Sequence, residues 1–108
     1  MKVLIAGGLV SMALLVAMGN ARADDAKAMA EKKGCFGCHA LDHIIVGPAW
    51  KDVSARYKGD PEAEKKLVQS VMTGSSGKWG SKVHMQAQKQ LTPDEASRLV
   101  RYILSLQK

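Results

Sequence analysis

The stretch Cys35-Phe36-Gly37-Cys38-His39 decides how this chain is read, because Cys-x-x-Cys-His is the attachment pattern of a c-type haem. Two cysteines spaced in this way on one turn of helix can each form a thioether bond with a vinyl group of the same porphyrin. The histidine that follows is then carried beneath the ring, where its neutral imidazole can bind the iron. The motif predicts one covalently attached haem, held by Cys35 and Cys38 and ligated by His39.

Two other kinds of site use paired cysteines. A thioredoxin-like dithiol belongs to a βαβ unit, and the sequence has no pattern of that kind. A zinc site needs a second pair of ligands at close spacing. The chain contains only 2 cysteines, and neither His43 nor His84 falls in a recognised zinc pattern with them. Haem attachment is therefore the favoured hypothesis for the cysteines. His43 is interpreted separately, as a solvated surface histidine.

The first segment has the features of a secretory signal peptide. A positive start at Met1-Lys2 precedes an almost wholly apolar stretch, and Ala21-Arg22-Ala23 is a small-x-small cleavage site. The alternative is a membrane anchor, since the apolar stretch approaches the roughly 20 residues that span a bilayer. The abrupt change to Asp24-Asp25 favours cleavage. We therefore expect residues 1–23 to be removed and residues 24–108 to form one periplasmic domain with no membrane association.

The chain that remains after cleavage is barely long enough for one domain with a comfortable core. Small chains of this kind usually need an additional staple. A haem held by two covalent and two axial bonds would give the side chains a large apolar plate to pack against. The aromatic residues are otherwise few: Phe36, Trp50, Tyr57, Trp79 and Tyr102. We therefore expect folding and haem binding to be inseparable.

Hydrophobic spacing predicts four short helices joined by loops, and no strand. The first helix covers residues 25–33 and leads into the haem motif. The second covers residues 49–57, after a break at Val46-Gly47-Pro48. The residues turned inward by this spacing are Ala26, Met29 and Ala30 in the first helix and Trp50, Val53 and Tyr57 in the second.

Helix-start signals mark the other two helices. Asp60-Pro61-Glu62 supplies an N-cap, a first-turn proline and acidic groups at the positive end of the helix dipole. This third helix is expected to end at Gly74. Thr92-Pro93-Asp94-Glu95 is a capping box that starts the fourth. The expected inward residues are Leu67, Val68, Val71 and Met72 in the third helix and Ala96, Leu99, Val100, Ile103 and Leu104 in the fourth.

With the haem motif near the N-terminus and a capped helix at the C-terminus, the chain resembles class I cytochromes c, specifically the small bacterial cytochrome c-551/c-552 family. The resemblance covers residues 24–108. The family-like segments are Lys33-Gly34-Cys35-Phe36-Gly37-Cys38-His39-Ala40, Val46-Gly47-Pro48-Ala49-Trp50-Lys51-Asp52-Val53, Gly74-Ser75-Ser76-Gly77-Lys78-Trp79-Gly80 and the last helix. The family implies an all-α cytochrome c fold of about four short helices wrapped around one haem, with the first and last helices crossing. Gly34 and Tyr102 suit such a crossing, although ordinary turn and core packing explain them almost as well.

Position by position, the resemblance makes Cys35 and Cys38 the thioether carriers and His39 the proximal ligand. It also implies that the main-chain carbonyl of Pro48, or of a neighbour, accepts a hydrogen bond from the far imidazole N–H, which fixes the tautomer. Trp79 resembles the family tryptophan whose indole N–H reaches a haem propionate. A plain core or loop anchor is the alternative for Trp79.

The sixth ligand is where this sequence departs from the family pattern. Family members usually carry a Pro-Met-Pro-Pro-like run after the Trp-Gly, whereas this chain reads Ser81-Lys82-Val83-His84-Met85-Gln86-Ala87. Met85 is the best candidate, because it aligns with the family position and thioether ligation suits a high-potential carrier. His84 is a rival if the loop shifts by one residue. The missing prolines also predict a looser loop with more unfolded-state entropy to overcome.

Iron held by histidine on one side and methionine on the other has no open position, so it can exchange one electron but cannot readily activate a substrate. We therefore expect a soluble one-electron carrier, not an enzyme, between redox partners of a respiratory or photosynthetic chain. A haem enzyme or gas sensor with a labile sixth ligand is the alternative. An electron-transfer subunit of a larger redox enzyme is a third hypothesis.

The charge balance bears on partners. The formal net charge is +6 at pH 7, but Lys2 and Arg22 leave with the signal and two propionates reduce the excess further. Lysines around the haem edge are expected to attract a redox partner with an acidic docking surface, an effect that salt weakens. The alternative is that they serve solubility alone. These lysines are Lys32, Lys33, Lys51, Lys78, Lys82 and Lys89. We expect a monomer and no nucleic-acid partner.

Overall fold

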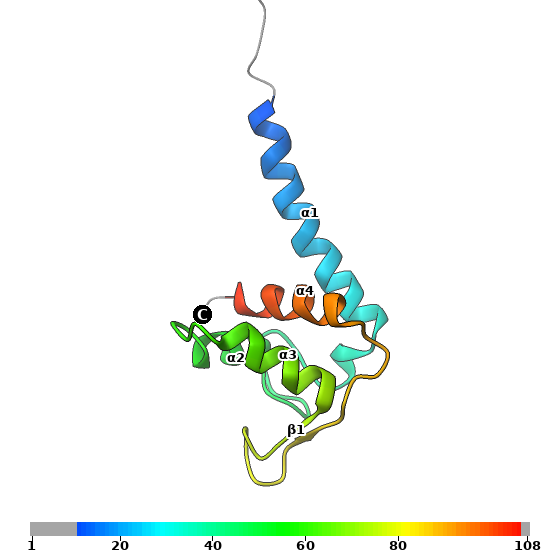
Figure 1. Cartoon of the computed structure of the whole chain (residues 1–108), viewed down its shortest axis with the longest axis vertical. Coiled ribbons are helices and arrows are strands. Elements are labelled where there is room, and N and C mark those ends of the chain that lie inside the picture. The colour runs from blue at the N-terminus through cyan, green and yellow to red at the C-terminus, as the bar shows by residue number, and fades with distance from the viewer. Residues whose placement is uncertain (1–10, 107–108) are drawn as a thin grey trace, which may run out of the picture.

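The computed structural model describes residues 11–106, with side chains described from Arg22 onward. This part of the chain is built from helices and one very short pair of strands (Figure 1). The helices are α1 (Ser11–Lys32), α2 (Trp50–Arg56), α3 (Ala63–Thr73) and α4 (Pro93–Leu104), with a 3-10 turn, η1 (Cys35–Gly37). The strands are β1 (Ser75–Ser76) and β2 (His84–Met85). The expected all-α architecture is confirmed.

Helix α1 is much longer than the sequence indicated. It begins at Ser11, where hydrophobic spacing predicted a start at residue 25, and it continues without a break through Ala21-Arg22-Ala23 (Figure 1). Alanine and leucine are strong helix formers, so the apolar leader extends the helix upstream. The start of the predicted signal peptide, residues 1–10, lies outside the described residues. No helix within residues 11–106 is both long and apolar enough to cross a membrane.

The start of α3 differs from the prediction. Asp60 was expected to be its N-cap, but the helix begins at Ala63. The Asp60 carboxylate instead accepts a hydrogen bond from the main-chain N–H of Glu62 at 2.8 Å. An aspartate that binds its own backbone two residues on forms a turn, and this turn precedes the helix. The predicted end is confirmed, because Gly74 follows the last helical residue with φ of 87°.

Helix α4 begins as predicted. The Thr92 hydroxyl accepts a hydrogen bond from the main-chain N–H of Glu95 at 3.1 Å, and the Glu95 carboxylate accepts one from the N–H of Thr92 at 2.9 Å. This is the reciprocal capping box, with Pro93 at the first helical position. The cap fixes where α4 begins.

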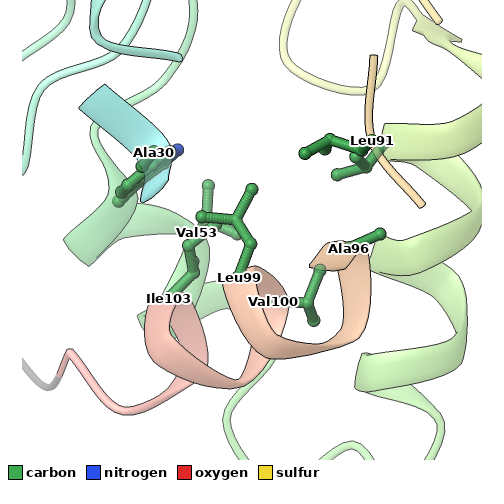
Figure 2. Packing of buried hydrophobic residues seen from close by; sticks show 9 residues of the cluster. Ala30, Val53, Leu91, Ala96, Leu99, Val100 and Ile103 are labelled. Carbon is green, nitrogen blue, oxygen red and sulfur yellow. The ribbon is translucent and has the colours of Figure 1, made fainter. Parts of the chain in front are cut away.

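The core forms where α4 packs against the other helices. Figure 2 shows Leu99 and Val100 of α4 among Val53 of α2, Ala30 of α1 and Leu91. The buried cluster is Ala30, Trp50, Val53, Val71, Leu91, Ala96, Leu99, Val100 and Ile103. The other predicted inward residues Met29, Tyr57, Leu67, Val68, Met72 and Leu104 are half-buried against it. Outside this cluster, Ala26 is 4% exposed. The predicted inward faces are therefore confirmed.

The first and last helices pack together, as the family resemblance implied. The Lys33 ammonium lies 3.7 Å from the Glu95 carboxylate, which places the end of α1 beside the start of α4. Gly34 makes no close approach: it has φ of 86°, and no other described atom lies within 4 Å of where its Cβ would be. Gly34 therefore permits the left-handed turn after α1. Tyr102 packs edge-on against Trp50, with ring centroids 6.2 Å apart.

The strands were not predicted from the sequence. They pair antiparallel, with Ser75 opposite Met85 and Ser76 opposite His84. A ladder of two residues on each side is too short to produce a period-two hydrophobic pattern. It nevertheless joins the end of α3 to the segment that carries Met85.

Candidate functional site

One cavity of about 380 Å³ brings together the residues that the sequence singled out. Its walls include apolar side chains from α2, α3 and α4, among them Val53, Val71 and Leu99. All six residues predicted for the site line it: Cys35, Cys38, His39, Pro48, Trp79 and Met85. His84, the rival ligand, lines the same cavity. Segments that are far apart in the sequence thus converge on one apolar space.

The cysteines are presented by the turn η1. The main-chain N–H groups of Cys38 and His39 both donate to the carbonyl of Cys35, at 3.2 and 3.1 Å. This tight turn directs the two thiols and the imidazole to the same cavity. Both cysteines are free thiols. Burial raises the pKa of the Cys35 thiol above its usual value, so this group stays protonated at neutral pH.

His39 is oriented by the loop that folds back beneath the motif. Its Nδ1 lies 2.8 Å from the carbonyl oxygen of Pro48. A carbonyl can only accept, so Nδ1 carries the proton in the neutral imidazole and Nε2 keeps a free lone pair. The loop itself is fixed by the Cys38 carbonyl, which accepts main-chain hydrogen bonds from Val46 and Gly47 at 3.2 and 2.8 Å.

The imidazole is also enclosed by an aromatic side chain. Trp50 is 3% exposed, and its ring centroid lies 5.6 Å from that of His39. Phe36 packs on the same indole, with centroids 4.9 Å apart. The sequence placed Trp50 on an inward helix face but did not connect it with His39. Its position two residues after Pro48 was the available signal.

The guanidinium of Arg56 packs over the ring of Trp79. The guanidinium carbon of Arg56 lies 4.3 Å from the centre of the Trp79 ring, within cation–π range. The same guanidinium donates to the carbonyl of Lys78 at 2.6 Å. The Lys78 ammonium donates to the Ser70 hydroxyl at 3.1 Å. The Trp79 loop is therefore fixed to both α2 and α3, a role of Arg56 that the sequence did not reveal.

Met85 and His84 are adjacent in β2 but have different surroundings. Met85 is half-buried and packs against the hydrophobic core. His84 is exposed, and its Nδ1 lies 3.0 Å from the Ser76 hydroxyl on β1. Successive side chains of a strand point to opposite faces. Met85 is therefore the better placed of the two to reach into the cavity.

Most of the remaining predicted features lie outside the cavity. His43 is an exposed surface residue, as expected, and its Nδ1 lies 3.0 Å from the Asp42 carboxylate. The hydrogen bond with His43 lowers the pKa of Asp42 below its usual value. Of the lysines expected near the haem edge, Lys78 alone is among the described residues that line the cavity.

An exposed apolar patch adjoins the cavity and was not anticipated. It consists of Ile44, Ile45 and Val46, whose exposed fractions are 71%, 48% and 59%. Val46 also lines the cavity. Three consecutive large aliphatic side chains in solvent are unusual on a soluble domain and are typical of a contact surface.

Comparison with known proteins identifies the family. The family model for cytochrome c matches residues 23–107. Cytochrome c-551 of Pseudomonas aeruginosa is 40% identical over 97 residues, which cover 90% of this chain and 90% of the relative. Cytochrome c-552 of Nitrosomonas europaea is 37% identical over 106 residues, which cover 98% of this chain and 99% of the relative.

A solved structure agrees with the sequence matches. The crystal structure of wild-type Nitrosomonas europaea cytochrome c552 has a TM-score of 0.72 at 33% identity, covering 75% of this chain and 99% of that chain. The cytochrome c fold expected from the resemblance is thus confirmed. The cavity supplies two free thiols, an oriented imidazole, a thioether and an apolar wall, a donor set that fits a covalently bound haem. The chain therefore belongs to the cytochrome c family, as a small class I c-type cytochrome with a single haem c.

Proposed function

We propose that this monohaem cytochrome is a soluble periplasmic carrier of single electrons in which His39 and Met85 occupy both axial positions of the iron. When bound, the haem would supply an iron that gains and loses one electron without binding a substrate. The supporting observation is the convergence of Cys35, Cys38, His39 and Met85 on one cavity. If His39 and Met85 both bound the iron, no coordination site would be left for catalysis, and we therefore propose that the protein is not an enzyme.

On the proximal side, the chain prepares His39 as a metal ligand. Its Nδ1 proton is engaged by the carbonyl of Pro48 at 2.8 Å, so Nε2 is the nitrogen proposed to bind iron. A hydrogen bond of this kind raises the basicity of the ligand and holds the ring in one orientation. Pro48 therefore contributes through its main chain.

On the other side, burial favours Met85 over His84. The Met85 thioether is an uncharged group whose half-buried position matches an apolar cavity wall. The His84 imidazole is exposed and close to the Ser76 hydroxyl. Although His84 also lines the cavity, it would have to leave its exposed position beside Ser76 to become a ligand. We therefore assign the sixth position to Met85.

The remaining roles concern attachment. Cys35 and Cys38 are proposed to form the two thioether bonds, for which their free thiols are required. The indole N–H of Trp79 is proposed to bind a propionate. Arg56 holds the Trp79 ring by its cation–π contact, which would keep the indole in place when the cavity is filled.

Export is part of this proposal. Residues 1–23 are proposed to be a cleaved signal peptide and residues 24–108 the periplasmic domain, because Ala21-Arg22-Ala23 has the small-x-small pattern. N-terminal sequencing of the haem protein from a periplasmic fraction tests this directly. A mature chain that starts at Asp24 is expected. A chain that retains its leader and sediments with membranes would contradict it.

We propose that the protein is a monomer and that its partners are redox proteins of a respiratory or photosynthetic chain. The exposed patch of Ile44, Ile45 and Val46 gives an uncharged contact surface beside the cavity. The excess of lysines would attract an acidic docking surface from a distance, so association should slow as salt is raised. The apolar patch would then supply contact that salt does not screen.

Carbon monoxide tests the carrier function. If His39 and Met85 both bind the iron, adding carbon monoxide to the ferrous protein at neutral pH should leave its absorption spectrum almost unchanged. Rapid and tight binding would instead indicate an open or labile sixth position. Such a result would favour the gas sensor or haem enzyme over the carrier.

A further inference from the structure

The segment that carries Met85 is attached to the C-terminal end of α3. Ser75 and Ser76, which directly follow α3 and Gly74, pair with Met85 and His84 of β2. After β2, the main-chain N–H of Gln88 donates to the carbonyl of Val71 at 2.9 Å. Figure 1 shows β1 at the end of α3, with the returning segment alongside. The Met85 segment is thus bound to β1, just beyond α3, at the methionine and to α3 itself after it.

The loop between the two strands closes on itself. The main-chain N–H of Gly77 donates to the carbonyl of Val83 at 3.0 Å, and the N–H of Val83 donates to the carbonyl of Gly80 at 3.0 Å. The family resemblance implies prolines on both sides of the methionine, where this chain carries His84 and Gln86. The ladder and these turns supply backbone constraint where the prolines are missing.

Gly74 lies at the point of contact between the two segments. Its φ is 87°, a backbone angle that residues other than glycine rarely adopt. A Cβ at this position would lie 3.0 Å from the carbonyl oxygen of Met85 and 3.2 Å from the main-chain nitrogen of Ala87. Both neighbours are backbone atoms, which cannot move away by rotating a side chain. Any larger residue at position 74 must therefore displace the backbone around Met85.

We propose that Gly74 is a positioning residue for the sixth iron ligand. By ending α3 at a φ of 87° and lacking a Cβ, it lets the Met85 backbone pack against the helix end. The end of α3, rather than flanking prolines, then holds the thioether at the iron. This inference rests on the proposed axial role of Met85.

Gly74→Ala tests the inference, with Gly77→Ala as the matched control. Gly77 has φ of 78° in the same loop, but no other described atom lies within 4 Å of its Cβ position. Both variants therefore introduce an alanine at positive φ, and only Gly74→Ala presses on the Met85 backbone. The purified haem proteins are compared by the weak long-wavelength absorption of the oxidised iron–thioether bond and by carbon monoxide titration of the ferrous form.

We expect Gly74→Ala to weaken the long-wavelength band and to raise the apparent carbon monoxide affinity about tenfold or more, because overpacking favours the state with Met85 released. Gly77→Ala should change the apparent affinity much less. Equal effects of the two variants would mean that loop strain alone matters, which overturns the proposal. Covalent haem content and the His39 side of the site should be unchanged in both.

A second pair of variants covers the case in which Gly74→Ala does not fold. Gln88→Pro removes the N–H that donates to Val71, whereas Gln88→Ala keeps it. Only the proline variant should release Met85. The unsubstituted protein could show the normal long-wavelength band, and the band could persist in both Gly74→Ala and Gln88→Pro. That result would overturn the role of Gly74 and leave that of Met85 intact. Absence of the band from the unsubstituted protein would contradict the axial role of Met85 itself, and the inference with it.

Discussion

Gly47 lies against the imidazole of His39 so closely that a Cβ at position 47 would be 2.7 Å from Cε1 and 3.1 Å from Nδ1 of the ring. The next residue, Pro48, accepts the hydrogen bond from the same ring at 2.8 Å. Two consecutive residues therefore fix the imidazole, one by leaving space and the other by binding its proton. The orientation of the proposed proximal ligand is set by the backbone of this dipeptide.

Gly47→Ala should disturb the proximal side selectively. The added methyl group overlaps the ring, and overpacking of this kind typically costs about 1–3 kcal/mol. We expect a lower midpoint of thermal unfolding and altered paramagnetic shifts of the His39 protons in the NMR spectrum of the oxidised protein. Gly37→Ala is the control, because no other described atom lies within 4 Å of its Cβ position. If the two variants behaved alike, the contact between Gly47 and His39 would have no structural weight.

Replacing Cys35 and Cys38 together by Ala should abolish covalent haem and leave the chain largely unfolded. The reason is the cavity of about 380 Å³ in the middle of a small apolar core, which the haem would fill. Haem staining after denaturing electrophoresis measures attachment, and far-ultraviolet circular dichroism measures helix content. A haem-positive band, or full helix content without haem, would contradict this expectation.

Local signals were the most reliable part of the sequence. The capping box from Thr92 to Glu95 predicted the start of α4 to the residue, because its hydrogen bonds span only one helical turn. The start of α3 was misplaced because Asp60 has two local options, an N-cap or a turn, and the sequence does not distinguish them. The upstream extension of α1 was missed because a signal-like pattern and a helical pattern coincide there.

The candidate site likewise combines local features, which the sequence predicted, with long-range contacts, which it did not. The motif from Cys35 to His39 is local and was read directly, whereas the contact between Gly47 and His39 needs a loop to fold back. The short ladder that separates His84 from Met85 depends on residues brought together by that fold. Such long-range main-chain contacts leave no periodic pattern in the sequence. Only the glycine at position 74 marked the place, and it was read simply as a helix end.

The capping box predicts an acid-sensitive contribution to stability. The hydrogen bond with the Thr92 backbone lowers the pKa of Glu95 below its usual value, with a smaller contribution from the Lys33 charge. A group with a lowered folded-state pKa stabilises the fold above its unfolded pKa, and this stabilisation is lost as the pH falls through the folded value. Glu95→Gln should therefore lower the unfolding midpoint at pH 7, and this effect should shrink as the pH is lowered towards 3.

Asp94→Asn is the matched control for Glu95→Gln. It removes a negative charge from the same first turn of α4 but leaves the reciprocal hydrogen bonds of Thr92 and Glu95 in place. Its effect on the unfolding midpoint at pH 7 should be smaller. A Glu95→Gln effect that is the same at pH 7 and pH 3 would show that the carboxylate charge plays no part in the cap.

The two adjacent candidates for the sixth ligand are separated by Met85→Ala and His84→Ala. If Met85 binds the iron, its replacement should remove the long-wavelength band of the oxidised protein. The reduction potential should also fall by about 0.1 V or more, a modest share of the about 0.8 V that axial ligands span. His84→Ala should leave both nearly unchanged, because His84 is exposed and its Nδ1 lies 3.0 Å from the Ser76 hydroxyl instead.

A slip of the loop by one residue reverses these expectations, since His84 would then give a low-potential site indifferent to Met85→Ala. Potentials measured side by side decide between the two ligands, and a large change confined to His84→Ala would overturn the assignment of Met85.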